Sequence, residues 1–214
     1  MLSALLHRFC WPHRAAVLVL AALLLGGCGG AAPEQGGPTS LPGLSGLAWV
    51  GDDRFVAVHD AKGEGDEAKR NRVSLLRLPR GSRDGIVRTP LAVRFPGGVA
   101  RDLEAASPIP GGGLLLAESG QKGGSQRLFF ARLVDSVLVI DAQVPWPLSV
   151  DNVEAVEVGR VGDQLVLLAA ERGRGQERTT LHWATLSLDP PRFDTFQTID
   201  WPAIDPLGPR ARAV

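Results

Sequence analysis

The sequence predicts an all-β protein made of β-propeller blades, and three observations lead to this prediction. From Leu41 onward the apolar stretches are short and are separated by Gly, Pro and Asp, which is typical of short strands. No segment in this region shows the period of about 3.6 residues that a long helix requires. The pattern strand, tight turn, strand, longer polar loop, strand, strand occurs three times, which is typical of blades of four antiparallel strands.

Each repeat is expected to fold as one antiparallel sheet whose first strand lines the centre of the propeller. The expected strands are 44–49, 55–60, 73–78 and 91–95 in the first repeat, 102–107, 114–120, 127–133 and 137–141 in the second, and 152–157, 165–170, 181–188 and 193–199 in the third. Continuous apolar runs such as Leu114–Ala117 indicate sheets that are covered on both faces by neighbouring blades. A β-sandwich is the alternative architecture for the same strands.

About three blades are fewer than the four to eight, roughly, with which a propeller closes its ring. An open arc leaves exposed sheet edges, which favour aggregation. We therefore expect residues 41–214 to form a partial propeller, apparently the N-terminal half of a six-bladed one, which is either truncated or closed by a partner. The tryptophans of this region are expected in the core between blades rather than on a ligand platform; they are Trp49, Trp146, Trp183 and Trp201.

Residues 1–27 have the layout of an export signal. The first 14 residues hold four basic or potentially basic side chains and no acidic one. An uncharged apolar stretch follows at residues 15–25 and ends in small residues. This stretch is shorter than the roughly 20 residues of a membrane-spanning helix, so we interpret it as a signal peptide.

The tetrapeptide Leu25-Gly26-Gly27-Cys28 resembles the lipobox of bacterial lipoproteins. The resemblance implies that the chain is cut before Cys28 and that its thiol is joined to a diacylglyceryl anchor. Residues 28–40 are rich in glycine and are predicted to form a flexible tether. Because Gly29 rather than Asp follows the cysteine, the resemblance favours the outer membrane, facing the periplasm. An ordinary secreted protein or an uncleaved anchor is the alternative.

The composition excludes several kinds of chemistry in the mature chain. The full chain has 23 basic and 23 acidic residues, and loss of the two arginines of the signal leaves 21 against 23, a formal charge of about −2. We therefore expect no nucleic-acid partner. Cys10 lies in the signal and Cys28 is expected to be acylated, so no free thiol and no disulfide are expected. The chain has no tyrosine, and a multi-histidine metal site is not expected because only His59 and His182 follow the signal.

Acidic residues recur at corresponding places in the repeats. Glu104 and Glu154 belong to the opening strands of the second and third repeats, with Gly46 expected at the corresponding place of the first, and Glu118 and Glu171 end the second strands. Carboxylates that meet at one axis repel each other, and a hard cation such as calcium would remove that repulsion. The alternative is structural, with each glutamate accepting hydrogen bonds from backbone N–H groups of a neighbouring blade. Further candidate ligands are Asp60 and Asp102.

A histidine and two serines are candidates for nucleophilic catalysis. His59 is the candidate general base, and Ser45 and Ser119 are the candidate nucleophiles. Neither serine lies in a Gly-X-Ser-X-Gly turn. Asp60 follows His59 directly and is expected on the opposite face of the strand, so it cannot simply orient the imidazole. A histidine with purely structural partners is the alternative.

Arginines mark the loop that follows the second strand of the third repeat. Arg172, Arg174 and Arg178 lie there, and the charged loop 62–72 takes the corresponding place in the first repeat. Both loops are expected on one rim of the propeller. A cationic rim above acidic residues could hold a phosphorylated ligand, whereas the alternative is a pair of solvated loops.

The openings of the repeats resemble those of the esterase-like phytase propellers, a family of exported bacterial proteins. The motifs are Ser45-Gly46-Leu47-Ala48-Trp49 with His59-Asp60, then Asp102-Leu103-Glu104-Ala105, then Asn152-Val153-Glu154-Ala155. Glu118 and Glu171 match the acidic residue with which this family ends the next strand, whereas Ala105 stands where the family often has Gly. The resemblance covers residues 41–199 and implies the propeller fold more strongly than an activity.

We therefore expect an envelope lipoprotein whose phytase-like propeller binds a small ligand, such as a phosphorylated one, or a protein partner. The alternative, implied by the resemblance, is a calcium-assisted phosphoester or ester hydrolase. The two functions differ in one geometric requirement. A hydrolase of this kind needs the four glutamates within metal-binding distance of one another, beside an arginine that reaches the phosphate.

Overall fold

The described part of the chain consists of β-strands and the turns and loops that connect them. The computed structural model describes residues 43–60, 72–81, 85–119, 126–172 and 179–200, which belong to one compact unit. The predicted all-β class is confirmed, and so are the three sheets that each contain four antiparallel strands. Within these ranges there is no helix of the length and hydropathy that a membrane span requires.

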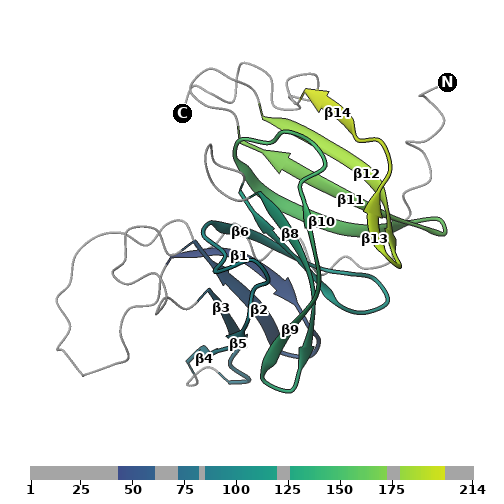
Figure 1. Cartoon of the computed structure of the whole chain (residues 1–214). Helices are drawn as coiled ribbons and strands as arrows, with labels where there is room; N and C mark the ends of the chain where they lie inside the picture. The colour runs from purple at the N-terminus through teal and green to yellow at the C-terminus, as the bar shows by residue number, and fades with distance from the viewer. Residues whose placement is uncertain (1–42, 61–71, 82–84, 120–125, 173–178, 201–214) are drawn as a thin grey trace, which may run out of the picture. The chain divides into compact units, whose positions relative to one another are not determined.

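The first blade has the strand order β1-β2-β3-β4 (Figure 1). Its strands are β1 (Leu44–Trp49), β2 (Arg54–His59), β3 (Val73–Arg77) and β4 (Val87–Pro90). The prediction of a fourth strand at 91–95 is wrong. Leu91 and Phe95 instead fill the core between the first two blades, and the Phe95 ring meets the Phe129 ring edge to face with centroids 4.9 Å apart. An apolar run can serve a core without forming a strand, and the sequence pattern does not distinguish the two.

The second blade has the order β6-β7-β8-β9, and the short strand β5 extends it. The strands are β5 (Ala92–Val93), β6 (Leu103–Pro108), β7 (Leu114–Glu118), β8 (Arg127–Val134) and β9 (Val137–Pro145). β5 runs parallel to β9, so the connection from the first blade becomes an edge strand of the second. Between β6 and β7, the residues Gly111, Gly112 and Gly113 have φ angles of 100°, 121° and 95°. Glycine adopts this region without the steric penalty of a Cβ atom, which explains the predicted Pro-Gly-Gly-Gly turn.

The third blade has the order β10-β11-β12-β13, and β14 also pairs with β12. The strands are β10 (Val153–Val161), β11 (Gln164–Glu171), β12 (Thr180–Leu188), β13 (Pro191–Phe193) and β14 (Gln197–Asp200). The outer strand expected at 193–199 is therefore divided in two. Phe193 and Phe196 pack against the core between the second and third blades, which accounts for the interruption.

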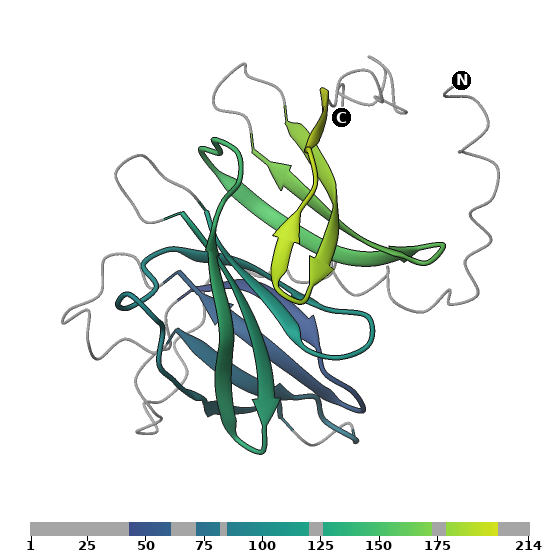
Figure 2. The same ribbon diagram turned by 45° about the vertical axis from the view of Figure 1, so that its right-hand side comes forward.

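The first strands of the three blades lie beside one another, as a propeller requires. β6 contacts β1 on one side and β10 on the other, and the second blade lies between the other two (Figures 1 and 2). The side chains of β7 alternate between two cores. Leu114 and Leu116 belong to the core shared with the first blade, and Leu115 and Ala117 to the core shared with the third. This alternation explains why the strand is apolar throughout.

Each blade has a β-bulge at the second residue of its first strand. The extra residue is Ser45 in the first blade, Glu104 in the second and Glu154 in the third. The blades are therefore equivalent in register as well as in strand order. The expectation that Gly46 corresponds to Glu104 is wrong by one residue, because a bulge leaves no mark in the apolar pattern.

The residue after each bulge is small, and it is Gly46, Ala105 or Ala155. In the first blade the reason is the close approach of β1 to β6. A Cβ atom at position 46 would lie 2.8 Å from Cα of Ala105 and 3.0 Å from the backbone nitrogen of Ala106. Backbone atoms cannot move aside as a flexible side chain can, so glycine sets the distance between the first two blades.

Candidate functional site

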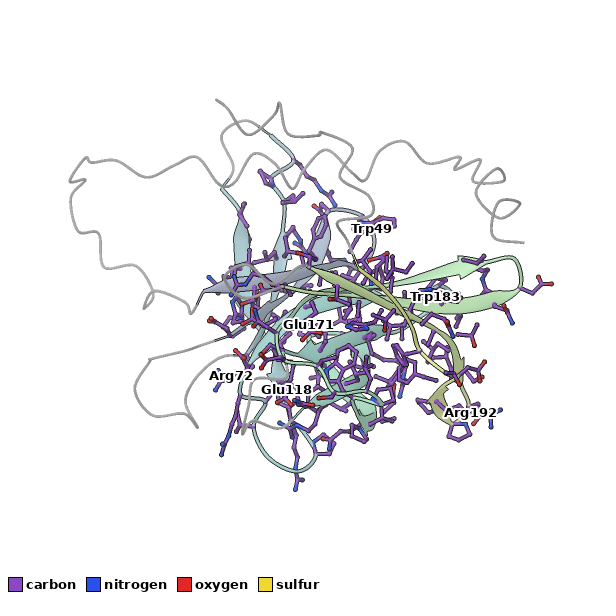
Figure 3. The ribbon with its side chains drawn as sticks, turned by 90° about the horizontal axis from the view of Figure 1, so that it is seen from above. Trp49, Arg72, Glu118, Glu171, Trp183 and Arg192 are labelled. Atoms are coloured by element: carbon purple, nitrogen blue, oxygen red, sulfur yellow. The ribbon has the colours of Figure 1, made fainter. Side chains whose placement is uncertain are left out.

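Glu118, one of the four predicted ligand glutamates, is enclosed in the second blade (Figure 3). The Arg127 guanidinium donates to both of its carboxylate oxygens, with N–O distances of 2.6 and 2.9 Å. The backbone N–H of Arg101, just before β6, donates to the same carboxylate at 3.1 Å. A bidentate arginine neutralises a buried carboxylate and uses its lone pairs. This environment fits the structural role that the sequence left open, except that Glu118 binds its own blade rather than a neighbouring one.

Arg127 also holds the connection that enters the second blade. Its guanidinium lies 5.0 Å from the centroid of the Phe129 ring. It donates at 3.1–3.2 Å to three backbone carbonyl oxygens, those of Pro96, Gly98 and Val99. Arg127 does not stand out in the sequence, because an arginine after a polar loop is usually solvated. The sequence does contain one indication of its role. Glu118 ends β7 and Arg127 begins β8, and these two strands pair.

Glu171 has the same structural role in the third blade as Glu118 has in the second. It accepts hydrogen bonds from the backbone nitrogens of Asp151 at 2.5 Å and Asn152 at 3.3 Å, just before β10. Its other oxygen is 3.1 Å from Nε2 of His182, and Nδ1 of that ring is 3.0 Å from Oγ1 of Thr198. Three strands, β11, β12 and β14, are linked in this way. His182 thus has a structural role that the histidine count alone could not reveal.

The remaining two glutamates are partly exposed and belong to a polar group that we call the strand-end cluster. The cluster comprises Asp102, Glu104, Ser119, Asn152, Glu154 and Arg172. Three of these six side chains are carboxylates and one is a guanidinium, so the group has a net negative charge. The two glutamates are the bulge residues of β6 and β10, which contact each other.

Hydrogen bonds order both halves of the strand-end cluster. In the third blade, the amide of Asn152 donates to Oε1 of Glu154 at 2.9 Å, and Nη2 of Arg172 lies 3.2 Å from the same oxygen. In the second blade, the Ser119 hydroxyl donates to the carboxylate of Asp102. The backbone N–H of Val153 donates to the carbonyl oxygen of Ser119 at 2.8 Å and joins the two halves.

The ion pair between Arg172 and Glu154 lies at the surface, and 68% of the arginine side chain and 36% of the glutamate side chain are exposed. Exposed pairs of this kind contribute little to stability, because water screens them and both side chains lose freedom. A ligand that offered Glu154 a better cation, or Arg172 a better anion, could therefore replace the pair at small cost. This property distinguishes the strand-end cluster from the enclosed pair of Glu118 and Arg127.

A second polar group lies within the first blade. Nε2 of His59 is 2.7 Å from Oγ of Ser74, which is within the reach of a general base and a nucleophile. Nη2 of Arg88 lies 3.1 and 3.2 Å from the two ring nitrogens, and burial lowers the pKa of its guanidinium. Neither His59 nor Ser74 has any exposed surface, so a substrate does not reach the hydroxyl. The serine beside His59 is thus neither Ser45 nor Ser119, and only the strand pairing reveals it.

Several predicted residues lie outside the described ranges. These are Cys28 with the signal and tether at 1–40, residues 62–71 of the charged loop, Arg174 and Arg178 of the predicted rim, and Trp201. The prediction that tryptophans lie in the core between blades is confirmed for Trp146 and is wrong for Trp49 and Trp183, which are exposed. Among the residues that are described, no three or more His, Cys, Asp or Glu side chains form a group placed to bind a metal ion. Calcium binding by the four glutamates and a cationic rim at the arginines stay predictions.

No protein-family model matches the sequence, and a search of curated proteins finds no significant match. The resemblance to phytase-like propellers therefore stays a prediction that depends on the short motifs at the blade openings. The fold does not decide the activity, because propellers of the same architecture serve unrelated functions.

Proposed function

We propose that the protein is a lipoprotein of the bacterial envelope that acts by binding, and that the strand-end cluster is its contact surface. One observation carries this proposal. The carboxylate of Glu118 is enclosed within the second blade, whereas Glu104 and Glu154 are partly exposed at bulges of adjacent strands, and the donors of Glu154 include an exposed arginine. Bulges often redirect a side chain beside a functional site.

The charges of the cluster favour a ligand, small molecule or protein, that presents a cationic group. Calcium is the simplest probe of this preference, because it takes carboxylate and amide oxygens in flexible geometry. Glu104 and Glu154 would supply the carboxylates, and the Asn152 side chain an amide oxygen. Arg172 would meet an anionic group of the same ligand, such as a phosphate.

Hydrolysis is less well supported than binding. A serine hydrolase needs a hydroxyl that a substrate can reach, next to a base. Ser74 has such a base in His59, and Ser119 has a carboxylate partner in Asp102, but both serines are fully buried. The described residues thus offer a ligand surface more readily than a nucleophile.

Calorimetric titration of the purified full-length protein with calcium tests the cationic preference. We expect binding that the Glu104→Gln, Glu154→Gln double variant loses at least tenfold. Glu157→Gln, which removes a carboxylate from the same strand outside the cluster, should bind as the wild type does. Equal binding by all three proteins would contradict the assignment of the site. Hydrolysis of p-nitrophenyl phosphate in the same samples should not exceed the rate without protein, and a rate that depends on Glu104 would favour the hydrolase.

A protein partner is tested separately by cross-linking in intact cells. A photoreactive amino acid at position 172 is expected to give an adduct, whereas the same amino acid at Ser187, an exposed residue of β12 away from the cluster, is not. The adduct should weaken when Glu104 and Glu154 are both replaced by Gln. If calcium gives no heat and position 172 gives no adduct, the strand-end cluster is not a binding surface.

A further inference from the structure

The chain enters the first blade at the same end of the sheets at which the strand-end cluster lies. In the second and third blades, the cluster residues Asp102 and Asn152 stand directly before the first strand. Their counterpart in the first blade is Gly43, because the pairing register begins with the next residue in every blade. Gly43 follows the segment 28–42, which carries the predicted lipid on Cys28. The predicted anchor therefore joins the blades at their cluster end.

The first blade adds a carboxylate to this end of the sheets. Asp60 directly follows β2, as Ser119 follows β7 and Arg172 follows β11, so these three residues occupy equivalent places. Asp60 is partly exposed, and its Oδ1 atom lies 3.4 Å from the position that a Cβ atom of Gly43 would have. β1 also contacts β6. The polar surface of the strand-end cluster therefore continues to the point where the tether joins the first blade.

The length of the tether favours one orientation of the blades on a membrane. A flexible glycine-rich chain as long as the segment 28–42 spans about 20 Å between its ends on average. The opposite end of the blades is further away by the length of a strand. β9 and β10 have 9 residues each, which at about 3.3 Å per residue amounts to about 30 Å. An anchor at Cys28 therefore favours an orientation in which the cluster end is the nearer one to the lipid headgroups.

The cluster contains an ion pair that a zwitterion can replace. Nη2 of Arg172 lies 3.2 Å from Oε1 of Glu154, and both side chains have exposed surface. A ligand with a single charge that took one of these partners would leave the other without its counter-ion. A zwitterion replaces both partners at once, with an anionic group on Arg172 and a cationic group on Glu154. Glu104, the bulge residue of the neighbouring strand β6, supplies a second carboxylate for the cationic group.

We propose that the strand-end cluster binds the headgroup of a zwitterionic membrane phospholipid that has a primary ammonium group, such as phosphatidylethanolamine. This proposal rests on the proposed function, because it uses the same cluster and the same lipid anchor. The phosphate lies on Arg172, and the ammonium donates to Glu104 and Glu154. A primary ammonium has three N–H donors for these carboxylates, whereas the quaternary ammonium of choline has none. A headgroup with a net negative charge, such as that of phosphatidylglycerol, is repelled by the excess of carboxylates in the cluster.

Titration calorimetry of the full-length protein in detergent tests the headgroup chemistry. The probes are glycerophosphoethanolamine, which carries both charges, glycerol phosphate, which carries only the anionic group, and ethanolamine, which carries only the cationic group. We expect the first probe to bind about tenfold or more tightly than either of the others, which is the usual effect of a further hydrogen bond between charged groups. Equal affinities for the three probes, or no binding of the first, would overturn the zwitterion site.

Two arginine variants show whether the phosphate lies on the cluster. Arg172→Gln should weaken the binding of glycerophosphoethanolamine by about tenfold or more. The same variant should bind calcium more tightly, because it lacks the cation that competes for Glu154, and a protein that failed to fold could not show this gain. Arg192→Gln changes an exposed arginine of β13, which Figure 3 shows apart from Glu171, and should bind both probes as the wild type does. Equal headgroup binding by the two variants would overturn the position of the phosphate.

Fluorescence quenching in vesicles shows whether the headgroup belongs to a membrane lipid or to a free solute. Ser149 and Ser136 are exposed residues that follow and precede β9, at the cluster end and at the opposite end of the second blade. The vesicles contain equal parts of phosphatidylethanolamine and phosphatidylcholine, with a quencher on some headgroups. A fluorophore on Ser149→Cys should be quenched more strongly than one on Ser136→Cys.

The same measurement in vesicles of phosphatidylcholine alone is the control for the tether. The tether is present in both kinds of vesicle, so only a contact with phosphatidylethanolamine makes the difference between Ser149 and Ser136 larger in the mixed vesicles. Equal differences in the two kinds of vesicle, together with binding of glycerophosphoethanolamine, would mean that the ligand is a free solute and that the membrane assignment is wrong.

The calcium titration separates a failure of this proposal from a failure of the proposed function. Calcium binding that depends on Glu104 and Glu154, without binding of glycerophosphoethanolamine, would leave the strand-end cluster as a binding surface and would overturn only the headgroup. If neither probe binds, both proposals are wrong.

Discussion

The Arg127 guanidinium and the Glu118 carboxylate form a bidentate ion pair at the end of β7, and water has almost no access to either group. The same guanidinium holds three carbonyl oxygens of the connection from the first blade. One side-chain pair therefore fixes both the charge balance inside the second blade and the path by which the chain enters it.

Removing one partner of this pair should destabilise the protein strongly. Arg127→Met is expected to lower the free energy of unfolding by about 3–5 kcal/mol, because it leaves the Glu118 charge buried without a partner. Urea denaturation measures the loss. Arg132→Met breaks the exposed pair with Asp141 and should lower the free energy of unfolding far less, because water screens that pair. Similar losses in the two variants would show that the enclosed pair contributes no more to stability than the exposed pair does.

Gly46→Ala should separate the first two blades. The added methyl would lie 2.8 Å from Cα of Ala105, so we expect a loss of about 1–3 kcal/mol in the free energy of unfolding. Thermal denaturation followed by circular dichroism measures it. Gly159→Ala is the matched control, because nothing lies within 4 Å of a Cβ atom there. We expect the control to unfold at the wild-type temperature or above it, and a large loss there would contradict this explanation.

Glu157 should make stability fall as the pH rises. Burial raises the pKa of its carboxyl, and the hydrogen bond from Ser107 offsets this only in part. The folded state therefore binds the proton more tightly than the unfolded state. This contribution to stability is complete below the ordinary carboxyl pKa and is lost as the pH rises through the raised folded-state pKa.

Glu157→Gln removes that dependence, so the variant should gain stability relative to the wild type as the pH rises above the ordinary carboxyl pKa of about 4.3. Denaturation at several pH values measures the difference. Asp141→Asn should behave in the opposite sense, because hydrogen bonds from Arg132 lower the pKa of Asp141. Parallel pH profiles for the two variants would refute the assignment.

Cys28→Ser should abolish acylation. The thiol of Cys28 is the predicted attachment point of the lipid, and serine offers no thioether. We expect the wild type to incorporate labelled palmitate and the variant not to do so. Ser3→Ala, a change in the signal far from the predicted cleavage site, should leave labelling intact. Continued labelling of Cys28→Ser would remove the basis for the lipid anchor.

The fold was largely predictable because its pattern is local. Short apolar runs and Gly-rich turns indicated the strands, and the continuous apolar run of β7 indicated a sheet covered on both faces. The bulges at Glu104 and Glu154 were not predictable. One extra residue in a strand shifts the pairing register but leaves the apolar pattern of the sequence unchanged. Leu91 and Phe95 misled the prediction for the same reason, since apolar residues fill a core equally well from a connection.

The residue types of the site were predictable, but which glutamates are structural and which are exposed to a ligand was not. All four glutamates recur at corresponding places, yet Glu118 is enclosed and Glu154 is partly exposed. The difference depends on which donors surround each carboxylate, and Arg127 becomes a neighbour of Glu118 only when β8 pairs with β7. Periodicity along the chain contains no information on such partners, which become neighbours only through pairing.

The identical bulge in all three blades has a consequence for how such a protein can grow. A gene segment that encodes one blade also encodes both contact surfaces of that blade, since the sheet of the second blade packs one face against the first blade and the other against the third. Tandem duplication or loss of that segment would change the length of the array while leaving every joint intact. Variation in blade number then requires no simultaneous compensating substitutions.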